Sequence, residues 1–379
     1  MAKFVVSTSP HIRAEESIPT IMWTVVLALI PAGMFGVYVF GTEALLLIAI
    51  SIAAAVVAEH VIQKLRGLPS TIGDGSAVVT GLLLAYVISP AAPWYVPLIG
   101  SVFAIAVVKF AFGGLGMNIW NPALMGRAFV MSAYILLMTA TWIYPKPQMI
   151  WGELRRGGEL LHTGAEANST PAKKVDPEVF ATTTATPRAA VRAEILNAKD
   201  PDWEGWQEIK TAGSTPADWL RRIYERNKTS YIDLFLGTRG GCIGETGSIW
   251  LILGGLFLLF RRIIYWQVPA FYVGSVALLS WALPVKLAYG TAWFAGDPLF
   301  AIMSGGLMLG AFFMATDMVT SPVTRRGMAI FGIGCGLLTV IIRNYGGYPE
   351  GVCYAILLMN TAVPLIDRYI KPRKYGATA

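Results

Sequence analysis

Apolar and polar stretches alternate along the chain, and ten of the apolar stretches are candidates for membrane-spanning helices. A bilayer core about 30 Å thick requires about 20 apolar residues in a helix. The third, eighth and ninth stretches are short and rich in glycine, which is tolerated where a span is buried in protein or lines a cavity. The ten stretches cover residues 20–40, 43–63, 75–89, 94–113, 121–143, 247–265, 268–287, 298–315, 328–343 and 350–367.

One long polar segment, residues 144–246, separates five of these stretches from the other five. The pattern predicts an all-α polytopic membrane protein in three parts. Residues 1–143 form a first membrane repeat of five helices, the polar segment follows, and residues 247–379 form a second five-helix repeat with a tail. The polar segment contains the threonine-rich run Ala181–Pro187. By itself such a run is ordinary loop chemistry.

The composition supports this reading and changes how the net charge is interpreted. Hydrophobic residues make up 55% of the chain and charged residues 14%, against about 25% charged residues in soluble domains. The net charge of +7 would suggest nucleic-acid binding in a soluble protein. Here the basic residues cluster in short loops between apolar stretches, so we expect no nucleic-acid partner. The first apolar stretch, near Ile21, is long enough to remain as a span, so no cleavable signal peptide is expected.

The cysteines do not form a recognisable framework. Cys242, Cys335 and Cys353 show no CxxC spacing, so we expect neither a metal site nor a disulfide framework within this chain.

Lysine and arginine in the short loops predict how the chain is oriented. Cytoplasmic loops carry an excess of these residues, whereas long loops cross the membrane largely regardless of charge. The loops around residues 89–93 and 345–347 carry little charge. Both termini are therefore predicted in the cytoplasm and residues 144–246 outside it. The basic residues on the predicted cytoplasmic side are Lys64, Arg66, Arg261, Arg262, Arg325, Arg326, Lys371, Arg373 and Lys374.

The two sets of five stretches share a weak internal similarity. Residues 80–85 resemble residues 305–310, and a glycine pair precedes the last stretch of each set, at 113–114 and 346–347. Because five is an odd number, two such repeats must be inverted in the membrane. Inverted repeats commonly hold a substrate or cofactor site near the midplane, at broken or glycine-rich helices. Glycine is also simply frequent in membrane helices.

Two carboxylates beside short, glycine-rich stretches are candidates for chemistry. Asp74 and Asp317 each have hydroxyl neighbours, and carboxylate, hydroxyl and backbone oxygens suit a hard cation such as sodium. The same residues can instead cap helices or hold a polar ligand. A second candidate is the glycine-rich segment 238–246, whose backbone amides can approach a polar ring closely. A loop of this kind is more often only a turn.

These features come together in a family resemblance that covers nearly the whole chain. The chain resembles the NqrB/RnfD family, the membrane subunits of the Nqr and Rnf ion-translocating electron-transfer complexes. The short segment before the first stretch favours the Rnf branch, because NqrB proteins usually carry a longer one. The landmarks are Ser9–His11, Asp74–Ala77, Thr80–Leu84, Gly113–Asn118, Asn121–Ala123, Gly244–Thr246, Gly310–Phe313, Thr316–Asp317, Arg343–Val352 and Pro364–Asp367.

The resemblance implies a covalent flavin. In this family a flavin transferase esterifies flavin mononucleotide (FMN), through its phosphate, to a threonine in a Ser/Thr-x-Ala-Thr context. Thr183-Thr184-Ala185-Thr186 matches this context and makes Thr186 the acceptor, with Thr184 and Thr183 as alternatives. The position six residues before the acceptor, usually acidic in the family, is Phe180 here.

The resemblance also implies a second, non-covalent flavin, riboflavin or FMN, within the membrane part. We expect its contacts among glycine-rich and polar landmark residues. These are Asp74, Gly114, Asn118, Gly244, Glu245 and Asp317.

The function implied is a redox subunit of an Rnf-type ferredoxin:NAD oxidoreductase complex in the bacterial inner membrane, with electron relay coupled to Na⁺ or H⁺ transport. Its expected partners are the other Rnf subunits, including a second flavoprotein and iron–sulfur subunits. The alternative is a secondary transporter or channel, since an inverted five-plus-five repeat is a transporter architecture. The long exported segment with a flavin acceptor separates the two, because a transporter has no need of it.

Overall fold

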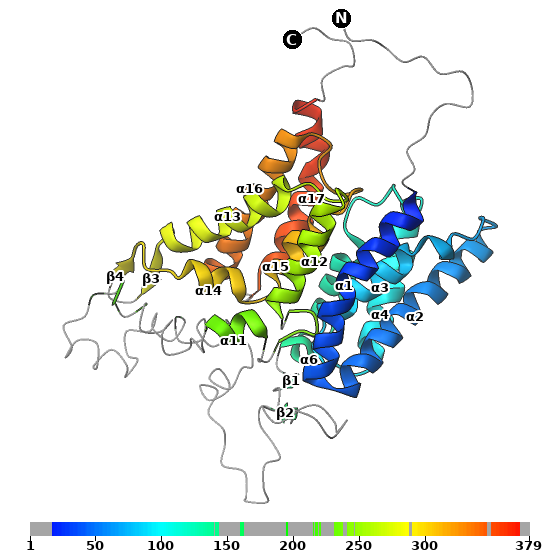
Figure 1. Ribbon diagram of the computed structural model, residues 1–379, viewed down its shortest axis with the longest axis horizontal. Coiled ribbons are helices and arrows are strands. Elements are labelled where there is room, and N and C mark those ends of the chain that lie inside the picture. The colour runs from blue at the N-terminus through cyan, green and yellow to red at the C-terminus, as the bar shows by residue number, and fades with distance from the viewer. Residues whose placement is uncertain are drawn as a thin grey trace, which may run out of the picture.

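The computed structural model shows ten helical regions arranged as two halves side by side (Figure 1), with a further helix at Tyr231–Leu236 and two small hairpins. Every structural statement below concerns the described residues. These are residues 17–139, 141–143, 160–162, 195, 215, 217–218, 220, 231–237, 241–245, 247–287, 290–346 and 350–371.

The first half begins with two long helices and continues with shorter ones. Ser17 caps the first helix by accepting a hydrogen bond from the Thr20 amide, and Gly41, with φ of 77°, ends it. Such a φ favours glycine over other residues. The elements are α1 (Ile18–Phe40), α2 (Thr42–Leu65), η1 (Ile72–Asp74), α3 (Ser76–Tyr86), α4 (Tyr95–Phe103), η2 (Ala104–Phe110), α5 (Pro122–Ala133) and α6 (Ile135–Thr139).

The second half contains the other five helical regions. Its third region is broken into three pieces, while its fourth is a single long helix capped by Thr324. The elements are α12 (Ser248–Phe260), α13 (Gln267–Ala282), α14 (Pro298–Met303), α15 (Leu307–Leu309), η3 (Gly310–Met314), α16 (Arg325–Tyr345) and α17 (Val352–Tyr369).

Each of the ten predicted stretches contains helix, but their lengths differ from the prediction in three places. The ninth stretch is not short, because α16 has 21 residues. The fifth is not one helix: α5 ends at Ala133, and α6 and a short strand follow. The seventh ends early, at Ala282, since Pro284 disfavours helical geometry in the residue before it. The third stretch is short, as predicted, and the eighth, also predicted to be short, is in addition broken into three pieces.

Membrane character is clearest in three helices. α1, α2 and α16 are long and apolar enough to cross a bilayer, and α3, α4 with η2, and α12 are shorter apolar helices. Large apolar side chains on α1 and α2 are exposed, for example Met34 at 68% and Val57 at 60%. A water-soluble surface rarely carries so extensive an apolar face, whereas lipid accepts it. The structure is thus that of a polytopic membrane protein, and the number of spans stays a prediction.

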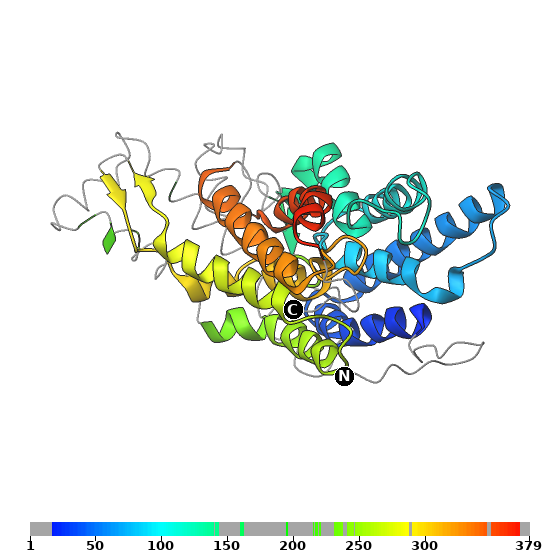
Figure 2. The same cartoon turned by 90° about the horizontal axis from the view of Figure 1, so that it is seen from above.

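The same neighbour relations occur in both halves. α2 contacts α3 and α4, and α13 contacts α14 and α16. α4 contacts α5 in the first half, and α16 contacts α17 in the second. The halves meet through their first helices, α1 with α12, and through their last, α5 with α17, as the views from the side and from above show (Figures 1 and 2). Two similar halves would give these relations, and their inverted orientation remains a prediction.

The strands are an addition to the predicted all-α fold. β1 (Thr141–Ile143) pairs with β2 (Leu160–His162), and β3 (Val285–Leu287) pairs with β4 (Gly290–Ala292), both antiparallel. Each strand has three residues, so the fold remains essentially helical. The hairpin β3–β4 packs in a small apolar cluster with the described helix of the polar segment, α11 (Tyr231–Leu236), and with α14.

The end of the polar segment inserts between helices of the first half. The amide of Ile243 donates to the carbonyl of Ile88, and that of Gly244 donates to the carbonyl of Tyr86. A Cβ at Gly244 would lie 2.4 Å from the Tyr86 Cβ, so the approach requires glycine. Residues 241–245 are buried and belong with the helical body, although the sequence groups them with the polar segment.

The orientation of the chain can be tested with reporter fusions. The start of α1 and the end of α17 lie in the upper part of Figure 1, whereas β1, which precedes the polar segment, and α11, which belongs to it, lie in the lower part. We expect reporters fused at Asp202 and at Arg326 to respond from opposite sides of the membrane, with Arg326 in the cytoplasm. Reporters that respond from the same side would contradict this topology.

Candidate functional site

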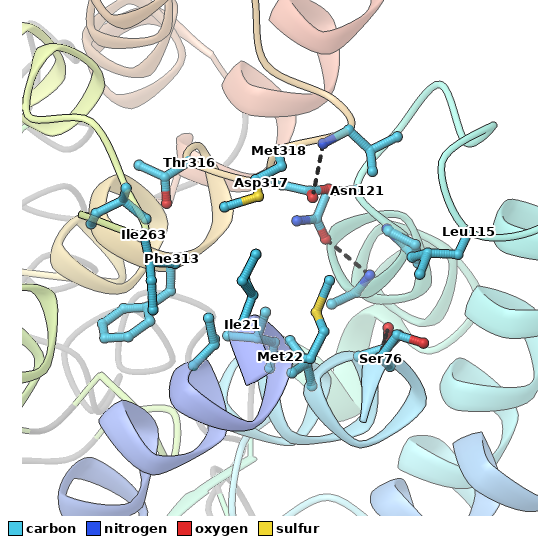
Figure 3. Close-up of a pocket in the computed structure, with 18 of the residues that line it drawn as sticks. Ile21, Met22, Ser76, Leu115, Asn121, Ile263, Phe313, Thr316, Asp317 and Met318 are labelled. Carbon is cyan, nitrogen blue, oxygen red and sulfur yellow. Dashed lines mark hydrogen bonds between the residues drawn. The ribbon is translucent and has the colours of Figure 1, made fainter. Parts of the chain in front are cut away.

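A cavity lies at the junction of the two halves, and we call it the junction cavity. Its walls come from α1, α3, η2 and the start of α5 on one side, and from the end of α12, η3 and the residues after η3 on the other. Most of its lining is apolar, and polar groups project into it at a few places (Figure 3). These polar residues are Ser76, Thr80, Lys109, Asn118, Asn121, Thr316 and Asp317.

Asn121 connects the two halves beside this cavity. Its Oδ1 accepts hydrogen bonds from the amides of Ala123 and Leu124 and so caps α5. Its Nδ2 donates to the carbonyl of Met314, at the end of η3, over 3.3 Å. Asn118 lies nearby, 6% exposed, and its Nδ2 donates to the Trp120 carbonyl. The loop before α5 is therefore fixed at the cavity wall by amide side chains.

Asp317 is the acidic group of the cavity. Its two carboxylate oxygens accept hydrogen bonds from the Val319 amide at 3.3 Å and from the Thr320 hydroxyl at 3.1 Å. Figure 3 shows its side chain on the opposite side of the cavity from Ser76. Among the described lining residues it is the one carboxylate.

Two wide helical turns, η2 and η3, contribute to the cavity wall. Both are π-helical, a geometry that is rare and frequently found at functional sites. η2 carries Lys109, and η3 carries Phe312 and Phe313, all three of which line the cavity. A wide turn rotates the residues that follow it relative to a regular helix. In this way each half can place side chains at the cavity wall: Lys109 from η2 in the first half, and Phe312 and Phe313 from η3 in the second.

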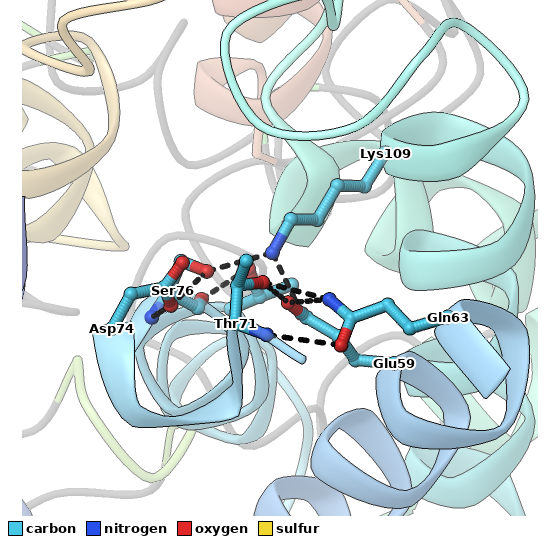
Figure 4. A network of polar contacts seen from close by, with 7 residues as sticks. Glu59, Gln63, Thr71, Asp74, Ser76 and Lys109 are labelled. Atoms are coloured by element: carbon cyan, nitrogen blue, oxygen red, sulfur yellow. Dashed lines mark hydrogen bonds and ion pairs between the residues drawn. The ribbon is translucent and has the colours of Figure 1, made fainter. Parts of the chain in front are cut away.

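Lys109 belongs to a buried network that sequence reasoning missed (Figure 4). Its Nζ donates to Glu59 Oε2 at 2.6 Å and to Ser76 Oγ at 2.7 Å. Glu59 is fully buried and Lys109 is 2% exposed. Glu59 lies six residues before the last residue of α2, Leu65, where solvent contact would be expected from the sequence, but its side chain is fully buried. A lysine within the apolar stretch 94–113 is the signal that points to this pair.

A second buried cluster joins the halves away from the cavity, and we call it the Arg127 cluster. From α5, Arg127 Nη2 contacts Glu350 Oε2 at 2.5 Å, and Nη1 lies 3.7 Å from Glu245 Oε1. All three side chains are buried. Cys242 lies with the carboxylates: its Sγ and one oxygen of each are within 4.8 Å of one another. The Arg127 guanidinium gives both carboxylates a positive partner. The Arg127 cluster therefore links elements of the two halves through buried ion pairs.

Known proteins resemble this chain over nearly its whole length. The sequence profile of the NQR2, RnfD, RnfE family matches residues 5–376. The chain belongs to the NQR2, RnfD, RnfE family. A relative from Clostridium ljungdahlii, named as a subunit of the proton-translocating ferredoxin:NAD(+) oxidoreductase complex, is 44% identical over 374 residues, which cover 98% of this chain and 96% of that protein.

Two further relatives show the range of names in the family. One from Acetobacterium woodii, named as a subunit of the Na(+)-translocating ferredoxin:NAD(+) oxidoreductase complex, is 43% identical over 375 residues, 98% of this chain and 95% of the relative. One from Halorhodospira halophila, named as a subunit of the ion-translocating oxidoreductase complex, is 37% identical over 375 residues, 97% of this chain and 94% of the relative. The resemblance that the sequence landmarks indicate is thus confirmed at the level of the family.

The landmark residues of this NQR2, RnfD, RnfE family member lie in different places. Asn118 and Asp317 line the junction cavity. Asp74 lies just behind it, where its Oδ1 accepts from the amide and hydroxyl of Ser76. Asp74 precedes α3, whereas Asp317 follows η3, so the two carboxylates do not occupy corresponding positions in the two halves. They are nevertheless close to one cavity, because Ser76 lines it.

The other residues expected to contact the non-covalent flavin lie outside the cavity lining. Gly114 is buried with φ of 105°, so its role is to turn the chain after η2. Gly244 packs on Tyr86, and Glu245 belongs to the Arg127 cluster. Thr186, the expected flavin acceptor, lies outside the described residues.

Proposed function

We propose that this protein is the RnfD-type membrane subunit of an ion-translocating ferredoxin:NAD oxidoreductase complex in the bacterial inner membrane, and that it relays electrons through two flavins. One flavin is FMN esterified to Thr186 by a flavin transferase. The other is a non-covalent riboflavin or FMN in the junction cavity. The family membership and the names of the relatives support the complex. The other Rnf subunits, including a second flavoprotein and iron–sulfur subunits, are the proposed partners.

The junction cavity is the observation that supports the non-covalent site. A flavin ring is flat and largely apolar with polar edges, and cofactor pockets are typically apolar with a few placed polar groups. The cavity offers such a set: amides at Asn118 and Asn121, the Thr80 hydroxyl, and one charge of each sign at Lys109 and Asp317. When bound, a flavin supplies electron transfer, while the protein supplies position and electrostatics.

Side chains at the rim must move for a ring to enter. The cavity encloses about 100 Å³, which is below the roughly 300 Å³ of small cofactor pockets. Met22, Leu115 and Met318 line it, and Met318 is 52% exposed. Methionine side chains are flexible and adapt to irregular partners. We therefore propose that these rim residues swing outward around the bound ring, while the asparagine and aspartate positions remain fixed.

The transported ion is Na⁺ or H⁺ in this proposal. One relative is named as proton-translocating and another as Na(+)-translocating, and their identities to this chain are 44% and 43%. The overall sequence identity to these two relatives therefore favours neither Na⁺ nor H⁺ as the transported ion. Asp317, with the hydroxyls of Thr316 and Thr320 close by in the sequence, provides the oxygen atoms that suit a hard cation.

Acid precipitation of the purified complex tests both flavins together. Covalent flavin stays in the pellet and migrates with this subunit in a denaturing gel, whereas non-covalent flavin enters the supernatant. We expect both fractions to contain flavin. The Asn118→Leu variant should lose flavin from the supernatant and keep it in the pellet, which serves as the internal control. A wild-type subunit that releases no flavin would overturn the junction-cavity site.

The two carboxylates near the cavity should differ in their effect on electron transfer. Asp317→Asn removes the negative charge that lines the cavity, and we expect electron transfer in the assembled complex to fall by about tenfold, equivalent to about 1.4 kcal/mol in the barrier. Asp74→Asn should have a smaller effect, because Asp74 contacts the cavity only through Ser76. Stopped-flow reduction of the complex measures both rates. Wild-type rates in both variants would show that the carboxylates only cap helix ends.

A further inference from the structure

Lys109 places a buried positive charge on the wall of the junction cavity. The side chain is 2% exposed and lies on the wide turn η2, in the middle of an apolar stretch. Holding an ammonium group at such a depth is costly, and ionisable residues of this kind usually serve a function. Two of its three N–H donors bind Glu59 and Ser76, and the Phe110 ring centroid lies 5.7 Å from Nζ.

Glu59 is held in place independently of the lysine. Its Oε1 accepts hydrogen bonds from the Gln63 amide at 3.1 Å and the Thr71 hydroxyl at 3.0 Å, and only Oε2 binds Lys109. Glu59 does not line the cavity, whereas Lys109 does. The positive charge of Lys109 is therefore close to the cavity, and the negative charge of Glu59 lies behind it, farther from the cavity.

We propose that Lys109 and Glu59 together set the reduction potential of the ring bound in the junction cavity. This inference rests on the proposed function, since it requires a redox ring there. Reduction adds negative charge to the ring, and a fixed positive charge in a medium of low dielectric constant favours the reduced form. Glu59 weakens this effect by partly neutralising the lysine. Lys109 is thus a tuning residue, and Glu59 is its counter-charge.

The opposite signs of the two charges make the inference testable. In the purified complex, Lys109→Met should lower the midpoint potential of the non-covalent flavin and Glu59→Gln should raise it. We expect at least a tenfold change in the ratio of affinities for the reduced and oxidised ring, or about 30 mV for a two-electron couple. The double variant should return close to the wild-type potential. Lys64→Met is the matched control, because it removes an exposed lysine of α2 and should leave the potential unchanged.

A purely structural ion pair predicts a different result. If the pair only packs α2 against η2, both single variants lower flavin content or stability together, and neither shifts the potential in a direction that follows its charge. Lys109→Arg keeps the charge and should keep the potential. Titration of the flavin-stripped complex with oxidised riboflavin, followed by fluorescence quenching, should show similar affinity in the wild type, Glu59→Gln and Lys64→Met, because neither variant changes a residue that lines the cavity and the oxidised ring carries no added charge.

The outcomes separate this inference from the proposed function. If the wild-type complex holds no non-covalent flavin, the proposed function fails and the inference fails with it. If the flavin is present but its potential does not move in opposite directions in the two variants, the inference alone is wrong. Where Lys109→Met does not assemble, Glu59→Gln decides: an upward shift supports the inference, and no shift or a downward shift overturns it.

Discussion

Replacing Thr186 by alanine is expected to remove all covalently bound flavin from this protein while the chain still inserts into the membrane. The expectation follows from the sequence Thr183-Thr184-Ala185-Thr186 and from the flavin attachment that the family resemblance implies. The bond joins the threonine Oγ1 to the flavin phosphate, and alanine has no oxygen with which to form it. Insertion depends on the apolar helices on either side, which the substitution does not touch.

Neighbouring threonines provide the controls for this experiment. Thr183→Ser and Thr184→Ala should retain the flavin, because both variants keep the Ser/Thr-x-Ala-Thr context and the Thr186 hydroxyl. In-gel fluorescence of the denatured protein gives the yield, and mass spectrometry of the peptide gives the site. Flavin mass on Thr184 or Thr183 in the wild-type protein would show that the acceptor is assigned wrongly. Restoring an acidic residue, by Phe180→Asp, should leave the site unchanged and increase the modified fraction.

Replacing Arg127 by methionine is expected to destabilise the protein more than any other single change in the described helices that we consider. Arg127 is the positive partner of both Glu350 and Glu245, and its removal leaves two buried carboxylates facing each other. Breaking a buried ion pair by removing one partner typically costs about 3–5 kcal/mol. We expect a lower level of this protein in the membrane and a lower midpoint in thermal unfolding of the detergent-solubilised protein.

Removing all the charges of this ion pair should restore much of the loss. The triple variant Arg127→Met with Glu245→Gln and Glu350→Gln replaces the ions by neutral groups of similar size, and such replacements are often neutral or stabilising. Arg326→Met, at an exposed arginine, is the control for loss of a positive charge. If the triple variant were as unstable as Arg127→Met alone, the packing of the Arg127 side chain, and not its charge, would stabilise the contact between the two halves at this cluster.

The helical body was largely predictable because its signal is local. Apolar stretches of a given length are read directly from the sequence, and each contains helix. The errors arose where local signals were weak or mixed. The predicted ninth stretch began after the charged pair Arg325–Arg326, although these residues form the first turn of α16. The predicted seventh stretch ran past the end of α13, which depends on Pro284. Burial of residues 241–245 could not be predicted, because it depends on hydrogen bonds to Tyr86 and Ile88, more than 150 residues earlier in the chain.

The candidate site could be predicted from the sequence only where a polar residue stands out in a recognisable sequence motif. Asn118 and Asp317 stood out as polar landmarks, and both line the cavity. Lys109 and Glu59 were weakly marked, since a single charge in an apolar stretch does not reveal its partner 50 residues away. The Arg127 cluster was not foreseen as a group, although Glu245 was singled out for another role. Its members come from α5, the turn before α12 and the residues just before α17, and only the tertiary fold brings them together.

The contact between Arg127 and Glu350 also has a consequence for how the protein is made. The two residues are 223 positions apart, and at about 5–20 residues per second a ribosome needs roughly 10 to 45 s to travel from one to the other. During that interval α5 is synthesised without its acidic partner, and an arginine near the centre of a helix costs about 2.5–3.5 kcal/mol to insert. We therefore expect Arg127 to pair first with Glu245 and to gain its shorter contact, to Glu350, only when the end of the chain has been made. Chains truncated before Glu350 should lack this contact, and we expect membrane proteases to degrade them faster than the full chain.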